Sequence, residues 1–253
     1  AIRSFPAGSS AGPDGLRPQH LLDLISNKDT GQALVTAITA LVNLLLDGRC
    51  PPEVAPSHFG GRLFALQKKA GGVRPIAIGC TWRRLSAKCA NSYALSQLGD
   101  RLLPTQVGVG ARGGCEAAVH AVRRYIPSMK DDSILVKLDF QNAFNSVRRD
   151  VMLRAVADQI PGIYKFCLLS YGGSTELKVG DRIICSEEGA QQGDPLGSLL
   201  FCLAVHPLLT SLSSDLKVAF MDDVTLGGRS PTVVNDVKAI IARGTDFGLS
   251  LNI

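Results

Sequence analysis

The sequence predicts an α+β fold in which helices pack on an antiparallel sheet. Two observations predict it: long segments carry apolar residues at helical spacing, and short apolar runs come in pairs around turns. The chain of 253 residues contains 45% hydrophobic and 19% charged residues, which is ordinary for a folded protein. A chain of this length forms one large domain or two lobes.

Seven segments are predicted to be helices. The clearest has Leu34, Ile38, Leu41 and Leu45 on one face, and Gly48 follows it as a stop signal. An extended lead-in that ends in a turn is expected before the first helix. The lead-in covers residues 1–17, with its turn at 12–15. The first helix begins at Pro18, and the other six cover residues 31–46, 81–98, 115–125, 149–159, 196–212 and 233–247.

Strand signals form three hairpins and one further strand. The loop of the first hairpin contains Lys68 and Lys69, and its second strand contains Arg74. The last hairpin turns at Asp222 and Asp223. The strand segments are 62–66 with 73–78, 134–138 alone, 176–179 with 182–186, and the two arms of 216–226.

The bulk composition narrows the class of protein only slightly. Lys and Arg outnumber Asp and Glu by 27 to 22, and this excess of +5 permits a polyanionic partner but equally fits a solvated surface. Seven cysteines without CxxC spacing argue against a disulfide framework and a zinc site, and they favour a reduced, intracellular setting. We expect no membrane span, because no run approaches the ~18 apolar residues that one needs.

Three aspartates are the candidate catalytic residues. Asp139 directly follows an apolar strand, and Asp222 and Asp223 lie at the tip of another. Carboxylates that are brought together repel one another unless cations lie between them, and hard oxygen ligands suit Mg²⁺. Two Mg²⁺ ions about 4 Å apart assist phosphoryl transfer in many enzymes. Considered without the other, the Asp222–Asp223 pair would be read as an ordinary turn, and Asp139 as the cap of the following helix.

The motifs around these aspartates resemble the polymerase palm motifs of reverse transcriptases. They are LDFQNAFNSV at 138–147, QQGDPLGS at 191–198 and FMDD at 220–223. The amino-acid sequences of these motifs are most similar to those in the reverse transcriptases of non-LTR retrotransposons. Upstream blocks resemble the fingers region of the same family, so the resemblance covers nearly the whole chain; these are GPDG at 12–15, VRPI at 73–76, QVGV at 106–109 and GGCEA at 113–117.

The resemblance implies a right-hand polymerase fold with fingers and palm. It places the fingers at 1–132, the first palm segment at 133–148, a fingers–palm connection at 149–190 and the second palm segment at 191–253. The family continues beyond this point into a thumb. We therefore expect a chain that is cut before the thumb, from a longer protein with endonuclease or other nucleic-acid-binding modules.

The implied activity is that of an RNA-directed DNA polymerase, which adds deoxynucleotides to a primer 3′-hydroxyl. The partners would be an RNA template, a DNA or RNA primer and deoxynucleoside triphosphates. Asp139 and Asp222 would bind two Mg²⁺ ions, with Asp223 in support, the Phe140 carbonyl as a further ligand and Mn²⁺ as a possible substitute. The backbone of Phe140 and Gln141 would brace the triphosphate.

Further residues are implied to bind the nucleotide or the template. Gln192 and Gly193 would face the nucleotide, and the ring of Phe144 would exclude a 2′-hydroxyl, although an aromatic residue there also fits core packing. Basic residues are expected to bind phosphates, although those in the hairpin loop also fit a solvated loop tip and those on the helix also fit an exposed helix face. Those expected at the nucleotide are Lys68, Lys69 and Arg74, and those expected at template phosphates are Arg83, Arg84 and Lys88.

Two other functions remain open at the level of sequence. An RNA-dependent RNA polymerase would favour a small residue at Phe144 and a glycine at Met221, and neither is present. A catalytically silent nucleic-acid scaffold would have lost an aspartate of the three, and all are present. The family implies a protein of the nucleus or cytoplasm.

Overall fold

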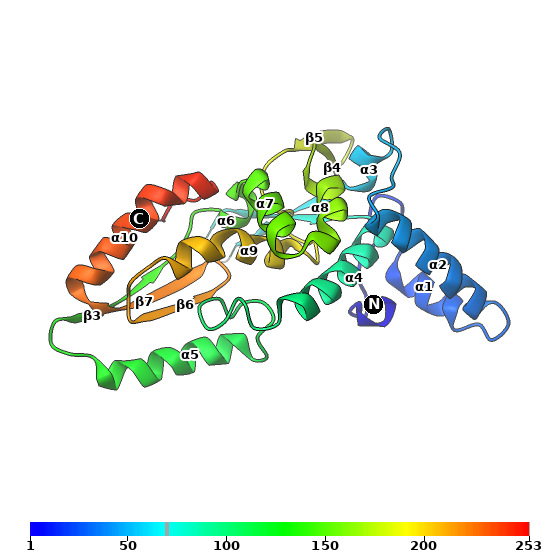
Figure 1. Ribbon diagram of the computed structural model, residues 1–253. Coiled ribbons are helices and arrows are strands. Elements are labelled where there is room, and N and C mark those ends of the chain that lie inside the picture. Colours follow the sequence, from blue (N-terminus) through cyan, green and yellow to red (C-terminus); the bar gives the residue numbers. More distant parts are fainter. Residues whose placement is uncertain (69–70, 253) are drawn as a thin grey trace. The chain divides into compact units, whose positions relative to one another are not determined.

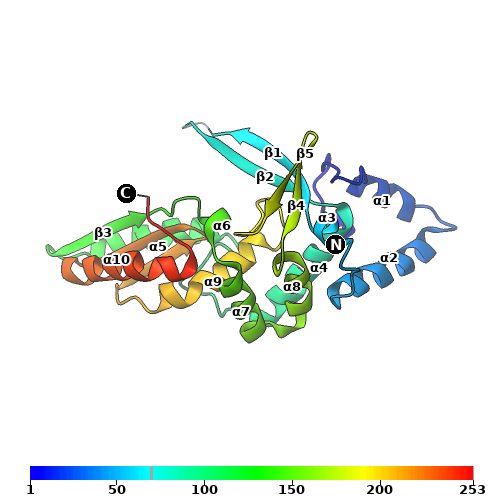
Figure 2. The same cartoon turned by 90° about the horizontal axis from the view of Figure 1, so that it is seen from above.

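A computed structural model describes residues 1–68 and 71–252 of the chain (Figures 1 and 2). The chain divides into two compact units. The first unit contains Ala1–Ala94, Ile160–Glu187 and Gln191–Gly197, and the second contains Leu95–Gln159, Glu188–Ala190 and Ser198–Ile253. The boundaries between fingers and palm that the resemblance implies stay predictions.

The helices of the first unit pack around the lead-in. A core cluster of Phe5, Leu21, Ile38, Val42 and Leu85 joins the lead-in to three helices, because these side chains are all buried against one another. Pro18 starts the first helix, where its missing N–H costs nothing. The helices of this unit are α1 (Pro18–Ile25), α2 (Gly31–Leu46), α3 (Ala55–His58), α8 (Tyr164–Tyr171) and, up to Ala94, α4 (Thr81–Leu98).

The first unit also contains a four-stranded sheet in the order β2-β1-β4-β5. Its hairpins β1–β2 and β4–β5 are antiparallel as predicted, but β1 and β4 pair in parallel through Gly61 and Arg62 alone. The β1–β2 hairpin therefore extends past β4 (Figure 2). The bounds are β1 (Gly61–Gln67), β2 (Val73–Ile78), β4 (Thr175–Val179) and β5 (Arg182–Ser186).

The second unit is built on an antiparallel sheet in the order β3-β7-β6. Helix α10 lies on one face of this sheet and α5 on the other (Figure 1). This arrangement confirms the predicted antiparallel sheet packed by helices. The elements are β3 (Ser133–Leu138), β6 (Leu216–Phe220), β7 (Asp223–Arg229), α5 (Gly114–Tyr125), α6 (Ala143–Ser146), α7 (Arg149–Gln159), α9 (Gly197–Thr210) and α10 (Ser230–Gly244).

Helix α9 is the buried helix that the sequence predicts. Its apolar side chains from Leu199 to Val205 are at most 2% exposed, although Pro207 lies within the helix. In the part of the chain that the structure describes, no helix combines the length and the apolar character that crossing a membrane requires.

The seven predicted helices are confirmed within about three residues at each end, whereas α3, α6 and α8 were not predicted. Helix α8 buries Phe166, Cys167, Ser170 and Tyr171 on one face, but the apolar Leu168 on the other side is 45% exposed. Its sequence therefore lacks the periodic pattern on which sequence prediction depends. The last helix begins at Ser230, three residues before the predicted start.

The carboxylate of Asp236 ties α10 to the start of β6. It is buried and accepts hydrogen bonds from the backbone N–H of Ser213 at 2.9 Å and from the N–H and hydroxyl of Ser214, both at 2.6 Å. Removing the acceptor leaves the buried N–H and hydroxyl of Ser214 unpaired.

We therefore expect Asp236→Ala to lower the free energy of unfolding by about 2–3 kcal/mol in chemical denaturation. Asp246→Ala, at an exposed carboxylate after the same helix, is the matched control and should change little. Equal unfolding midpoints for the two variants would contradict the role assigned to Asp236.

Candidate active site

The strand register of the second unit brings the candidate aspartates together. In the antiparallel β3–β7 ladder Leu138 pairs with Val224, so Asp139 and Asp223 occupy the next pair of positions. Asp223 in turn pairs with Phe220 of β6. Met221 and Asp222, the two residues between Phe220 and Asp223, form the turn. Asp139 thus ends its strand beside the Asp222–Asp223 turn.

The turn is held by the side chain of Gln106, which sequence analysis missed. Gln106 is fully buried; its Oε1 accepts from the Met221 N–H at 2.8 Å, and its Nε2 donates to the Met221 carbonyl at 3.1 Å. Met221 has a φ of 58°, which is unfavourable for a residue with a side chain. Gln106 thus stabilises a strained turn next to the aspartates.

Gly108 lets this loop approach the turn. Its N–H donates to Gln106 Oε1 at 3.1 Å. A Cβ on Gly108 would lie 2.5 Å from the Met221 nitrogen, so a larger residue would push the turn away. The only sequence signal for this role was the QVGV block, which gave family resemblance but no contact.

Each carboxylate has polar or charged neighbours within the second unit. Asp223 forms an ion pair with Lys137, at 3.0 Å between Oδ1 and Nζ, and this contact raises the pKa of Lys137 through the hydrogen bond and the charge of Asp223. Asp139 is exposed and accepts from Asn252 Nδ2 at 3.3 Å. Asp222 is half-buried, and its charge adds to the burial that raises the pKa of the Cys202 thiol.

The donor set fits Mg²⁺ in its chemistry, because it consists of carboxylate oxygens at neighbouring strand ends. The Lys137 ammonium on Asp223 shows that a cation is accepted there. Among residues 1–68 and 71–252, however, no three His, Cys, Asp or Glu side chains are grouped closely enough to hold a metal ion. Their convergence on a shared metal therefore stays a prediction.

The backbone that was expected at the triphosphate is paired with the C-terminal segment. The Gln141 N–H donates to the Ser250 carbonyl at 2.8 Å, and Phe140 forms an antiparallel bridge with Leu251. The Phe140 side chain is 4% exposed. A phosphate can reach the Gln141 N–H only if Ser250 moves away from it.

Phe144 lies in the short helix α6, close after Asp139. Its ring is half-buried and stacks on Phe201 of α9, with centroids 4.7 Å apart and planes at 22°. The Phe144 carbonyl accepts from the Ala190 N–H at 2.7 Å. Both contacts fix the residue while part of the ring stays accessible.

The other residues expected at the nucleotide belong to the first unit. The Gln192 carbonyl accepts from the Ala77 N–H of β2 at 2.8 Å. Gly193 has a φ of 114°, and a Cβ there would lie 2.4 Å from the Ala77 carbonyl oxygen, so only glycine fits. Arg74 and Lys68 are exposed on the β1–β2 hairpin, whereas Lys69 lies outside the described residues.

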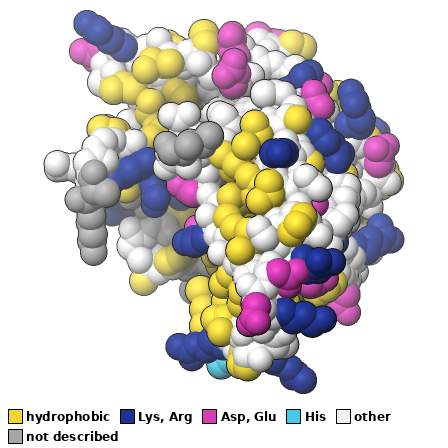
Figure 3. All heavy atoms as spheres, turned by 90° about the vertical axis from the view of Figure 1, so that its left-hand side faces the viewer, with side chains coloured by type: hydrophobic (Ala, Val, Ile, Leu, Met, Phe, Trp, Pro, Cys, Tyr) yellow, Lys and Arg dark blue, Asp and Glu magenta, His cyan; other side chains and the backbone are white. Residues whose placement is uncertain are grey.

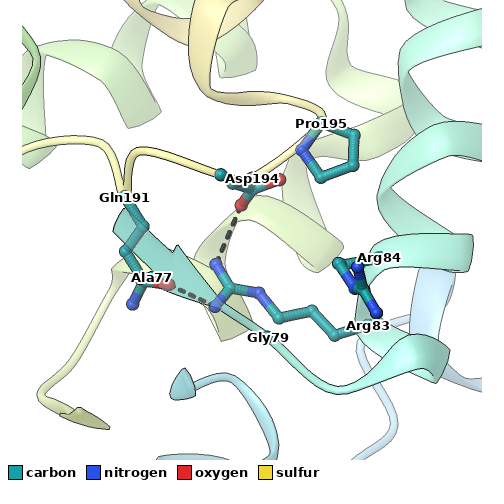
Figure 4. Close-up of a pocket in the computed structure, with 8 residues that line it drawn as sticks. Ala77, Gly79, Arg83, Arg84, Gln191, Asp194 and Pro195 are labelled. Atoms are coloured by element: carbon teal, nitrogen blue, oxygen red, sulfur yellow. Dashed lines mark hydrogen bonds and ion pairs between the residues drawn. The ribbon is translucent and has the colours of Figure 1, made fainter. Parts of the chain in front are cut away.

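The structure differs from the sequence prediction at the three basic residues of α4. Arg83 was expected at template phosphates, but its side chain is 3% exposed and forms an ion pair with Asp194 at 2.8 Å (Figure 4). Arg84 donates to the Ser10 carbonyl at 2.6 Å and Lys88 to that of Ser4 at 3.2 Å. The prediction is wrong for Arg83, while Arg84 and Lys88 bind the lead-in.

Positive charge is not concentrated on the face drawn in Figure 3. Lys and Arg side chains are spread over that face and alternate with Asp and Glu. The formal excess of +5 therefore produces no single polyanion-binding patch there.

Comparison with known families gives one match. Residues 66–253 match the family described as Reverse transcriptase (RNA-dependent DNA polymerase). This range contains the three aspartates, Phe144 and the Gln192–Gly193 pair. The comparison with curated protein sequences gives no match.

Several solved telomerase structures have a similar fold. A telomerase from Candida albicans, in complex with a TWJ fragment of telomeric RNA, is 12% identical with a TM-score of 0.58, covering 80% of this chain and 43% of the telomerase chain. An apo telomerase from Candida tropicalis is 11% identical with a TM-score of 0.59, covering 80% of this chain and 44% of the telomerase chain. At this identity the likeness shows the fold alone, and the chain spans less than half of either telomerase.

Substitution of Gln106 tests its hold on the turn. Gln106→Leu keeps most of the side-chain volume but leaves the Met221 N–H and carbonyl unpaired, so we expect a loss of about 1–3 kcal/mol of stability. Amide hydrogen exchange at residues 221–224 should rise more than at 134–137 of β3.

The exposed Gln97→Leu is the matched control, with no expected change in exchange at the turn. Unaltered exchange at 221–224 in Gln106→Leu would show that the strand pairing alone holds the turn.

Proposed function

We propose that this chain, which belongs to the reverse transcriptase (RNA-dependent DNA polymerase) family, is the fingers-and-palm part of an RNA-directed DNA polymerase. The observation that carries the proposal is the strand register that puts Asp139 beside the Asp222–Asp223 turn. Acidic residues at neighbouring strand ends are what two-metal nucleotide transfer requires.

In the proposed reaction the primer 3′-hydroxyl loses its proton to solvent, and its oxygen attacks the α-phosphorus of a deoxynucleoside triphosphate. A new P–O bond forms, the bond to the β-phosphate oxygen breaks, and pyrophosphate leaves with its electron pair. Bound Mg²⁺ or Mn²⁺ would make the hydroxyl more acidic and offset the charge of the triphosphate. Asp139, Asp222, Asp223 and the Phe140 carbonyl are the residues that would hold these ions.

The protein's own contribution is mainly to position groups and supply charge. In the second unit, Gln106 fixes the turn and the Phe144 ring supports the sugar. In the first unit, Gln192 and Gly193 would contact the base and sugar, and the exposed Arg74 and Lys68 would bind the phosphates. Lys69 keeps the same proposed role from the sequence.

The amino-acid sequences of the palm motifs support an origin in a non-LTR retrotransposon. On this proposal the chain acts within a longer protein with a thumb and endonuclease or other nucleic-acid-binding modules, in the nucleus or cytoplasm. Its partners are an RNA template, a DNA or RNA primer and deoxynucleotides. A catalytically silent scaffold and an RNA-dependent RNA polymerase are the alternatives. The first would extend no primer, and the second would prefer ribonucleotides to deoxyribonucleotides.

The aspartates are tested in the complete enzyme. Asp139→Asn and Asp222→Asn should each reduce Mg²⁺-dependent primer extension by at least about 100-fold, because a neutral amide binds the metal ions poorly. RNA binding should persist, because neither substitution removes a positive charge. Single-turnover extension and a filter-binding assay measure the two properties separately.

Asp181→Asn, at the exposed β4–β5 turn, is the control and should extend normally. Near-normal extension by either active-site variant would refute the two-metal assignment. A wild-type enzyme that binds RNA but never extends a primer would favour the silent scaffold.

Phe144→Ala tests whether the ring selects the sugar. If the ring excludes a 2′-hydroxyl, its removal should raise kcat/KM for ribonucleotides relative to deoxyribonucleotides by tenfold or more, as an order-of-magnitude estimate. If the ring only fills the core, the variant loses about 3–5 kcal/mol of stability and the ratio stays constant. The ratio and the unfolding midpoint are both measured.

Phe201→Leu is the control for packing, because it changes the stacking partner and leaves the ring of Phe144 in place. An unchanged nucleotide ratio in Phe144→Ala would exclude the steric gate.

A further inference from the structure

A buried polar cluster in the first unit has no part in the proposed chemistry described so far. The Asp194 side chain is 2% exposed, and its Oδ2 accepts from Arg83 Nη2 at 2.8 Å and from the Tyr171 hydroxyl at 2.6 Å. Its Oδ1 accepts from the Leu196 N–H at 2.9 Å. Burial, and then the charge of Asp194, raises the pKa of Tyr171, so the phenol stays a donor.

The same guanidinium also reaches the residue on the other side of the Gln192–Gly193 pair. Arg83 Nη1 donates to Gln191 Oε1 and to the carbonyls of Phe59 and Gly60. Gln191 is itself buried and donates to Thr175 Oγ1 at 3.0 Å. One arginine therefore anchors both flanks of the pair, at 191 and at 194 (Figure 4).

The pair between these anchors has a fixed backbone path. The Gln192 carbonyl accepts from the Ala77 N–H of β2, and Gly193 passes so close to Ala77 that a Cβ would overlap its carbonyl oxygen. A shift of the segment in either direction would break the hydrogen bond or cause a clash. The side chains of Gln191 and Asp194 are thus directed into the protein, while Gly193 is exposed.

Stability alone gives a weak reason for such a cluster. A buried ion pair pays a large desolvation cost, and well-packed apolar residues of similar volume often stabilise a fold equally well. What an apolar cluster lacks is direction, because hydrogen bonds define one arrangement where van der Waals contacts allow several. The cluster therefore suits a segment whose position matters for function.

We propose that Arg83, Tyr171 and Asp194 are positioning residues that hold Gln192 and Gly193 in place for the incoming nucleotide. We call these three residues the Asp194 clamp. The proposal rests on the proposed polymerase function, because it assigns the clamp to nucleotide binding. It also replaces the template-phosphate role that the sequence predicted for Arg83.

The clamp is tested with two conservative variants in the complete enzyme. Tyr171→Phe removes one hydroxyl, and Asp194→Asn removes the charge while keeping the shape. Each weakens one or two buried hydrogen bonds, so we expect the KM for deoxynucleotides to rise by about threefold to tenfold with a smaller change in kcat. Steady-state primer extension over a range of deoxynucleotide concentrations separates the two constants.

Hydrogen exchange provides a readout that needs no catalysis. In both variants the amides of residues 191–197 should exchange faster, because Leu196 donates to Asp194 Oδ1 and Gly197 to the Asp194 carbonyl. Amides of β3 and β7, in the second unit, should keep their wild-type rates. A purely structural role would instead raise exchange throughout the first unit and leave the KM unchanged.

Asp47→Asn is the matched control, because Asp47 forms an ion pair with Arg49 at 3.0 Å in the same unit but is exposed. It should alter neither the KM nor the exchange of residues 191–197. If Tyr171→Phe and Asp194→Asn behave like this control, the clamp is refuted. If the wild-type enzyme extends no primer, the polymerase proposal fails, while exchange at 191–197 still decides whether the clamp holds the segment.

Discussion

The register of β7 between β3 and β6 is the constraint on which the candidate active site depends. It puts Asp139 and Asp223 at adjoining positions and leaves two residues for the turn that carries Asp222. A slip of one residue would turn every side chain of β7 to the opposite face of the sheet. Gln106 opposes such a slip, because its amide bonds to both the N–H and the carbonyl of Met221.

Gathering carboxylates at one end of the sheet has an electrostatic cost, and the second unit offsets part of it with neighbouring groups. Lys137 lies two residues before Asp139 on β3, and its ammonium bonds to Asp223. Asn252 donates to Asp139 from the C-terminal segment, whose backbone also pairs with Gln141. Both contacts are at exposed carboxylates, so each is weak enough to give way to a metal cation.

Local signals were sufficient for seven of the helices, the hairpins and the strand-end placement of the aspartates, because each depends on neighbouring residues. The parallel pairing of β1 with β4 and the burial of Arg83 were not predicted, since both depend on partners far along the chain. Asp194 is 111 residues from Arg83, and nothing near either residue indicates the pair. An arginine on a helix is usually exposed, and that general tendency led to the template-phosphate prediction.

The two units stabilise their candidate residues by the same physical means. In the second unit a buried amide, Gln106, fixes the backbone beside the aspartates, and in the first a buried ion pair fixes the backbone around Gln192. Nucleotide transfer depends mainly on where groups are held, and a displacement of an ångström costs large factors in rate. Buried hydrogen bonds give this accuracy because an unpaired partner is costly, so each segment has one favoured position. Buried polar side chains, which hydrophobic sequence patterns do not predict, therefore hold the residues of the proposed function in position.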